Sequence, residues 1–111
     1  MKDFISYNQA LELKELGFDE PCFLYWYKAS NGYILLTEKN QTFQQYILAP
    51  TFSQAFRFFR DNHNLHHEIE YNGYEYLGYV SGMTANIFKT YEEAELACLR
   101  QLIEIVQGGN K

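Results

Sequence analysis

The feature that most constrains the fold is a helix-start signal that occurs three times, each time directly before an apolar run of helical period. In this signal, the capping box, a serine or threonine side chain accepts a hydrogen bond from the backbone N–H three residues later, where glutamine or glutamate commonly stands. The boxes begin at Ser6, Thr51 and Thr90. We therefore predict three helices, at residues 6–16, 51–62 and 90–106.

The apolar positions behind each box repeat every three or four residues, as one buried helix face requires. The clearest stripe consists of Phe52, Ala55, Phe56 and Phe59. Glycine follows the first and third predicted helices, where it commonly ends a helix. Residues 108–111 are expected to form a flexible tail.

Two Asn-Gly pairs, Asn31-Gly32 and Asn72-Gly73, lie between runs of aromatic and aliphatic residues. Because Asn-Gly is the typical sequence of a two-residue hairpin, we predict two antiparallel hairpins. The first joins residues 22–28 to 33–37, the second joins 66–71 to 74–80, and a further short strand is expected at 43–48.

The predicted order is α-β-β-β-α-β-β-α, an α+β fold in which an antiparallel sheet of four to five strands packs against three helices. A chain of 111 residues, 47% hydrophobic and 21% charged, predicts one compact domain over residues 1–111. No apolar run reaches the roughly 18 residues that a membrane span needs. The N-terminus also lacks a signal-peptide core, so we expect neither membrane association nor secretion.

The two cysteines, Cys22 and Cys98, lie far apart in the sequence, with no CxxC pair and no basic cluster beside either. We interpret them as buried free thiols of a reducing compartment rather than as a disulfide, a metal pair or a reactive centre.

The formal net charge of −5 disfavours binding to double-stranded nucleic acid, which depends on neutralising phosphates. Arg57 and Arg60 lie three residues apart on the second predicted helix and could hold a small anionic, nucleotide-like ligand. The alternative is that both arginines pair with the acidic first and third helices. No glycine-rich phosphate loop precedes this helix.

All three histidines, His63, His66 and His67, lie near Asp61 and Glu68 and are weak candidates for metal ligands. However, adjacent histidines in a strand point to opposite faces, and no zinc signature is present. A solvated helix end followed by a strand start explains them better. We expect no metal and no cofactor.

The chain has 10 tyrosines, 9 phenylalanines and 1 tryptophan, more aromatic residues than a small core needs. Tyrosine and tryptophan combine a large rigid ring with a polar group and are enriched at binding surfaces. With Arg57 and Arg60, the candidate ligand- or partner-binding residues on the hairpins are Trp26, Tyr71, Tyr74 and Tyr76.

Catalytic motifs are absent from the sequence, and Ser6, Thr51 and Thr90 are explained as helix caps. We therefore expect a non-enzymatic binder. The alternatives are a small histidine-dependent or metal enzyme and a structural component of a virion or its assembly.

Three blocks, at residues 5–18, 49–60 and 91–100, are similar to uncharacterised small proteins of Bacteroidetes phages, prophages and mobile elements. The resemblance implies a phage-type accessory protein that works in the cytoplasm of its bacterial host. It implies no mechanism. With the binder class, it suggests antagonism of host defence, either by holding a host protein or by sequestering a nucleotide signal. Either role is compatible with a homo-oligomer.

Overall fold

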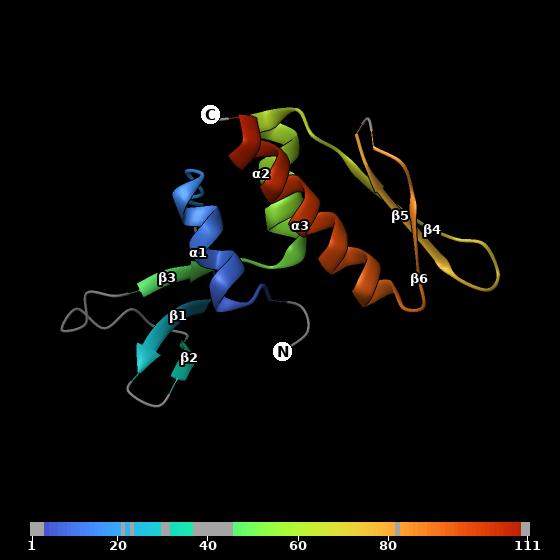
Figure 1. Ribbon diagram of the computed structural model, residues 1–111. Coiled ribbons are helices and arrows are strands. Elements are labelled where there is room, and N and C mark those ends of the chain that lie inside the picture. The colour runs from blue at the N-terminus through green and yellow to red at the C-terminus, as the bar shows by residue number, and fades with distance from the viewer. Residues whose placement is uncertain are drawn as a thin grey trace. The chain divides into compact units, whose positions relative to one another are not determined.

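The structure is a computed structural model that describes residues 4–20, 22, 24–29, 32–36, 46–81 and 83–109 (Figure 1). The contacts within the chain divide it into two compact units, Met1–Thr51 and Phe52–Lys111. Each unit contains a three-stranded antiparallel sheet and at least one helix, so the predicted α+β class is confirmed.

The first unit contains α1 (Tyr7–Glu15), β1 (Leu24–Ala29), β2 (Gly32–Leu36) and β3 (Tyr46–Ala49), with sheet order β2-β1-β3. The Ser6 side chain accepts a hydrogen bond from the Gln9 N–H at 3.4 Å, as the first capping box predicts. At the other end of α1, Phe18 N–H bonds to the Leu13 carbonyl and Gly17 N–H to the Lys14 carbonyl. This is a Schellman motif with Gly17 at C′.

Helix α1 packs against β3. The chain before the helix is joined to the end of β3 by a 3.0 Å hydrogen bond from Ile5 N–H to the Pro50 carbonyl. The buried side chains of this unit come from the helix, its flanks and the strands, and they include Ile5, Ala10, Leu13, Phe18, Leu24 and Ile47. The apolar period read from the sequence therefore marks the buried face of α1.

The second unit contains α2 (Phe52–His63), β4 (His67–Tyr71), β5 (Tyr76–Val80), β6 (Asn86–Phe88) and α3 (Tyr91–Gly109), with sheet order β4-β5-β6. In Figure 1 the three strands lie along one side of α3, which also packs against α2. The predicted stripe of α2 is buried at Ala55, Phe56 and Phe59. The Thr90 hydroxyl accepts a hydrogen bond from the Glu93 N–H at 3.1 Å and begins α3 as predicted.

The register places alternate residues of this sheet on opposite faces. Ile69 pairs with Gly78 and His67 with Val80, and these residues share the face toward α3. A Cβ atom at Gly78 would lie 3.2 Å from Cys98 Sγ and 3.4 Å from Ala94 Cβ. Helix and sheet approach too closely here for a larger side chain. The opposite face carries Glu68, Glu70, Leu77, Tyr79 and Ile87.

Two details of the predicted fold are wrong. The described strands form two sheets rather than one sheet of four to five strands, because each trio of described strands pairs within its own unit. The structure also adds β6, whose three residues are too few to show an alternating pattern.

Both predicted hairpins pair antiparallel strands, but neither has Asn-Gly as the two central residues of its turn, since Gly32 already pairs with Ala29 in the first. The second turn spans residues 72–75, because Tyr71 pairs with Tyr76 and not with Tyr74. Asn72 is therefore the first corner of the turn, and Gly73 occupies the first central position with φ +97°. Ser30 and Asn31, at the first predicted turn, lie outside the described residues, as do 43–45 of the predicted third strand.

Of the expected tail, Gly108 and Gly109 belong to α3, and residues 110 and 111 lie outside the described part.

Candidate functional site

The turn between β4 and β5 is held by the side chain and backbone of Asn72. Its Oδ1 accepts hydrogen bonds from the N–H groups of Tyr74 at 2.9 Å and Glu75 at 2.8 Å. Its own N–H donates to the Glu75 carbonyl at 3.1 Å. Gly73 adopts a φ of +97°, a backbone conformation that glycine reaches without steric cost. Three hydrogen bonds of Asn72 therefore fix the conformation of this turn.

Four tyrosines lie at this end of the sheet, and we call them the tyrosine tip: Tyr71, Tyr74, Tyr76 and Tyr91. The ring of Tyr76 lies 4.9 Å from that of Tyr71 and 6.0 Å, edge to face, from that of Tyr91 at the start of α3. The Tyr71 hydroxyl donates to the Gly73 carbonyl at 2.9 Å, which fixes its ring beside the turn.

The tip is exposed. The exposed fractions of the residues are 89% for Tyr74, 61% for Tyr71 and 43% for Tyr91. Partial burial and the nearby Glu95 carboxylate raise the pKa of Tyr91, so its phenol stays protonated at neutral pH. The tip thus offers exposed aromatic rings with polar hydroxyl groups.

On the face of the sheet away from α3, the Tyr79 hydroxyl lies between two carboxylates. It is 2.7 Å from Glu68 Oε2 and 2.9 Å from Glu70 Oε1. Both hydrogen bonds raise the pKa of Tyr79, and the bond to Glu68 has the larger effect. One phenolic proton serves two carboxylates, so the pair keeps free capacity to accept hydrogen bonds. Ile87 on β6 adds a residue of the same face that is 60% exposed.

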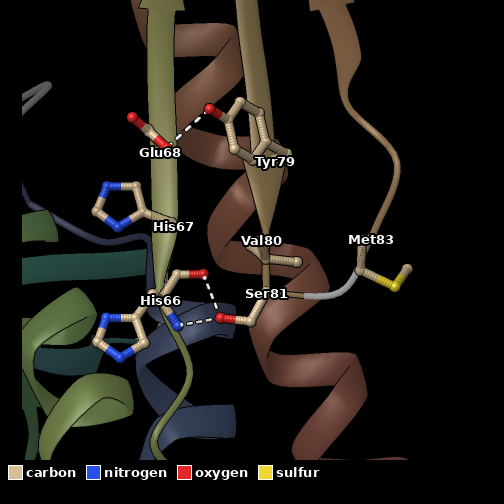
Figure 2. Close-up of a pocket in the computed structure, with 7 residues that line it drawn as sticks. All are labelled: His66, His67, Glu68, Tyr79, Val80, Ser81 and Met83. Atoms are coloured by element: carbon tan, nitrogen blue, oxygen red, sulfur yellow. Dashed lines mark hydrogen bonds between the residues drawn. The ribbon is translucent and has the colours of Figure 1, made fainter.

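An open hollow of about 250 Å³ lies at the other end of the sheet, where β4 begins and β5 ends (Figure 2). It is lined by His66, His67, Glu68, Tyr79, Val80, Ser81 and Met83. The Ser81 hydroxyl accepts from the His66 N–H at 2.9 Å and donates to the His66 carbonyl at 3.3 Å. Ser81 therefore extends the pairing of β4 and β5 by one residue pair, and its hydroxyl is already hydrogen-bonded to backbone groups of His66.

Two of the three histidines are packed against phenylalanines of α2. The His67 imidazole stacks on the Phe56 ring at 3.6 Å with an interplanar angle of 13°, and His63 lies edge-on to Phe58 at 5.3 Å. Burial, and then the positive charge of Arg60, lowers the pKa of His67. His66 is exposed. Within the described residues there is no group of three or more His, Cys, Asp or Glu side chains that could hold a metal ion.

Of the two predicted arginines, Arg60 lies away from the tyrosine tip. Arg57 and Arg60 are exposed on α2, and Arg60 acts electrostatically on His67, the first residue of β4. Tyr71 lies four residues further along this strand, roughly 13 Å away at the usual rise. The structure therefore brings together Tyr71, Tyr74 and Tyr76 of the predicted set, but it does not bring Arg60 to them.

Trp26, the remaining predicted residue, belongs to the first unit. Its indole N–H donates to the Ile5 carbonyl at 2.8 Å and joins β1 to the segment before α1. This contact gives Trp26 a role in the fold.

A second hollow, of about 320 Å³, lies within the first unit beside the end of α1. Its lining is Ala10, Lys14, Gly17, Phe18, Asp19 and Leu48. Lys14 is its one cationic side chain among the residues that the structure describes. Among the described residues that line the two hollows there is no arginine.

Both cysteines are free thiols. Cys98 is buried, as predicted, with Sγ 4.0 Å from the Tyr79 carbonyl, and Cys22 is only half-buried. Burial raises the pKa of each thiol to about 11, so both are protonated at neutral pH.

Sequence reasoning missed Tyr91, Glu70 and Ile87, and it considered Glu68 only as a neighbour of the histidines. Tyr91 follows a helix cap, and only the packing of α3 brings it to the hairpin. The alternation of Glu68, Ile69 and Glu70 was a usable signal, because it gives β4 one acidic face.

No family model, no curated protein and no solved structure matches the chain. The family resemblance of the three sequence blocks stays a prediction. In the part of the chain that the structure describes, no helix combines the length and apolar character needed to cross a membrane.

Proposed function

We propose that the protein is a non-enzymatic interaction protein that holds a protein partner through the tyrosine tip. The observation that carries the proposal is the exposure of Tyr71 and Tyr74 on a turn fixed by hydrogen bonds. Such rings lose little conformational entropy on binding and bury a large area, which is why tyrosine is frequent among the residues that dominate interface energies.

The geometry supports a protein partner over a sequestered nucleotide. A nucleotide site would need arginine beside the tyrosines, to hold phosphate while a ring stacks on the base. Arg60 instead lies beside His67, at the far end of β4 from the tip. A shallow, exposed aromatic surface matches a protein interface better than an enclosed small-molecule pocket.

The same proposal treats the protein as non-catalytic. Hydrogen bonds to backbone groups occupy the Ser81 hydroxyl, and the imidazole of His67 is packed face to face on Phe56. Following the resemblance, we place the protein in the cytoplasm of a bacterial host, with a host protein as its partner.

The test is capture from host lysate on the immobilised full-length chain, followed by identification of bound proteins by mass spectrometry. We compare the parent protein with a Tyr71→Ala/Tyr74→Ala variant. The control is Ile87→Ala, which truncates a side chain of similar exposure on the opposite face of the same sheet. Circular dichroism checks that all three chains are folded.

We expect a partner that the parent protein and the Ile87 variant retain and the double tyrosine variant loses by at least tenfold. Retention by the double variant contradicts the proposal, and so does equal loss in the control. A bound nucleotide in place of a protein would support sequestration instead.

A further inference from the structure

The outer edge of β4 carries backbone groups that point away from the sheet. Hydrogen bonds at both ends of the β4–β5 ladder fix its phase: Ser81 N–H bonds to the His66 carbonyl, and Asn72 N–H to the Glu75 carbonyl. Because hydrogen-bonded pairs alternate along an antiparallel ladder, Glu68 and Glu70 also direct their backbone groups toward β5. The N–H and C=O groups of His67, Ile69 and Tyr71 therefore point outward.

Within the described residues no strand pairs with this edge, since the sheet order is β4-β5-β6. An added strand could extend the sheet there through main-chain hydrogen bonds. Its residues opposite Glu68 and Glu70 would form the non-hydrogen-bonded pairs, in which side chains come closest. The edge thus places two carboxylates, two residues apart on one face, directly against any added strand.

A second copy of this chain fits the edge poorly. An antiparallel pairing centred on Ile69 would put Glu68 of one copy opposite Glu70 of the other. A pairing centred on Glu68 or Glu70 would put that glutamate opposite its own copy. Like charges directly opposite destabilise a sheet, so the edge resists self-pairing.

We propose that the edge of β4 binds an extended protein segment with lysine or arginine at two positions two residues apart, as a fourth strand of the sheet. The negative charges of Glu68 and Glu70 favour lysine or arginine at the two positions of the segment that lie opposite them. The edge is continuous with the tyrosine tip through Tyr71, which belongs to both. The inference rests on the proposed function, because it specifies the partner segment beside the same surface.

Tyr79 acts as a positioning residue for this edge. Its hydroxyl holds one oxygen of each glutamate, at 2.7 and 2.9 Å, and leaves the remaining carboxylate oxygens for the added strand. Oriented carboxylates lose less side-chain freedom on binding than mobile ones.

The probe is a blocked seven-residue peptide in which lysine alternates with valine, added to the full-length protein. Binding is measured by calorimetry, and amide exchange is followed by NMR. We expect one peptide per chain and slowed exchange at Ile69 and Tyr71. A peptide of equal charge with alternate backbone amides methylated should lose at least tenfold in affinity, because it cannot complete the ladder.

The matched variants are Glu68→Gln/Glu70→Gln, which keeps the hydrogen bonds to Tyr79, and Glu92→Gln/Glu104→Gln on α3, which removes the same charge from exposed positions. The first should weaken binding roughly tenfold and the second far less. Equal weakening by the two, tight binding of the methylated peptide, or unchanged exchange at Ile69 overturns the inference.

The two proposals fail separately. If the peptide does not bind but the double tyrosine variant still loses its captured partner, the edge inference alone is wrong. If the peptide binds and that variant keeps the partner, the proposed role of the tyrosine tip is wrong.

Discussion

Gly78 shows at the scale of one residue how closely α3 approaches the sheet. It stands opposite Ile69 in the ladder, and the space for a Cβ is bounded by Cys98 Sγ, Phe88 Cε2 and Ala94 Cβ within 3.2–3.4 Å. The small residues Ala94 and Cys98 follow at helical spacing on α3. Glycine on the strand and small residues on the helix together permit this packing.

We predict that Gly78→Val destabilises the protein by about 1–3 kcal/mol, because its methyl groups overpack this contact. Leu77→Val, one position along on the open face, is the control and should change stability by less than about 1 kcal/mol. Urea unfolding of both variants measures the difference. Equal effects at the two positions would show that α3 does not restrict Gly78.

The stacked His67 makes stability depend on pH. Its folded pKa lies below the ordinary value of 6.5, so between these two values the unfolded chain binds a proton that the folded chain does not. Neutral His67 therefore contributes fully to the free energy of unfolding above about pH 6.5. This contribution is lost as the pH falls through the folded pKa.

His67→Phe keeps a ring on Phe56 but cannot take up a proton. We predict that the melting temperature of this variant falls less than that of the parent protein between about pH 7.5 and 5.5. The control is His66→Gln at the exposed neighbouring position, which should retain the pH response of the parent. Identical pH responses in the parent protein and His67→Phe would refute the pH-dependent role of the half-buried, stacked histidine.

Single residues with local roles were predictable from the sequence. Ser6 and Thr90 act as helix caps because a cap needs only its own first turn. His67 stacks on Phe56, and Tyr91 approaches Tyr76, only because separate elements pack together. No local sequence pattern predicts these two contacts.

At the scale of elements, the β4–β5 turn explains why the predicted hairpin has a different register. Asn72 uses its side chain to hold the N–H groups of Tyr74 and Glu75, so it stands at the corner and not in the centre of the turn. The Asn-Gly pair located the turn correctly, but the side-chain hydrogen bonds determined which residues are central. The register then leaves Tyr74 at the exposed end.

Asn72→Ala removes the acceptor of both hydrogen bonds and should cost about 1–2 kcal/mol of stability. Asn72→Asp keeps a side-chain oxygen in place and should cost less. The measurement is denaturant unfolding of both variants, with NMR exchange of the Tyr74 and Glu75 amides. Unchanged protection of the Tyr74 and Glu75 amides from exchange in Asn72→Ala would contradict this account.

At the scale of the whole molecule, the sequence predicted the class of fold and the order of most elements but not the division of strands into two sheets. Hairpins specify neighbours in sequence, whereas assignment to a sheet depends on long-range pairing. Each strand trio pairs on its own side of the boundary before Phe52. The aromatic surplus drew attention to Tyr71, Tyr74 and Tyr76, which lie at one end of a sheet, but grouped them with Trp26, which lies in the other unit.

The most direct test of the central claim, that the tyrosine tip contacts a protein, is photo-crosslinking in bacterial host cells. A benzoyl-phenylalanine is placed at Tyr74, and at Glu104 on α3 as an exposed control. We predict a discrete protein adduct from the probe at position 74 and none of the same mass from position 104. Absence of an adduct at position 74, or the same adduct from both positions, would contradict the account.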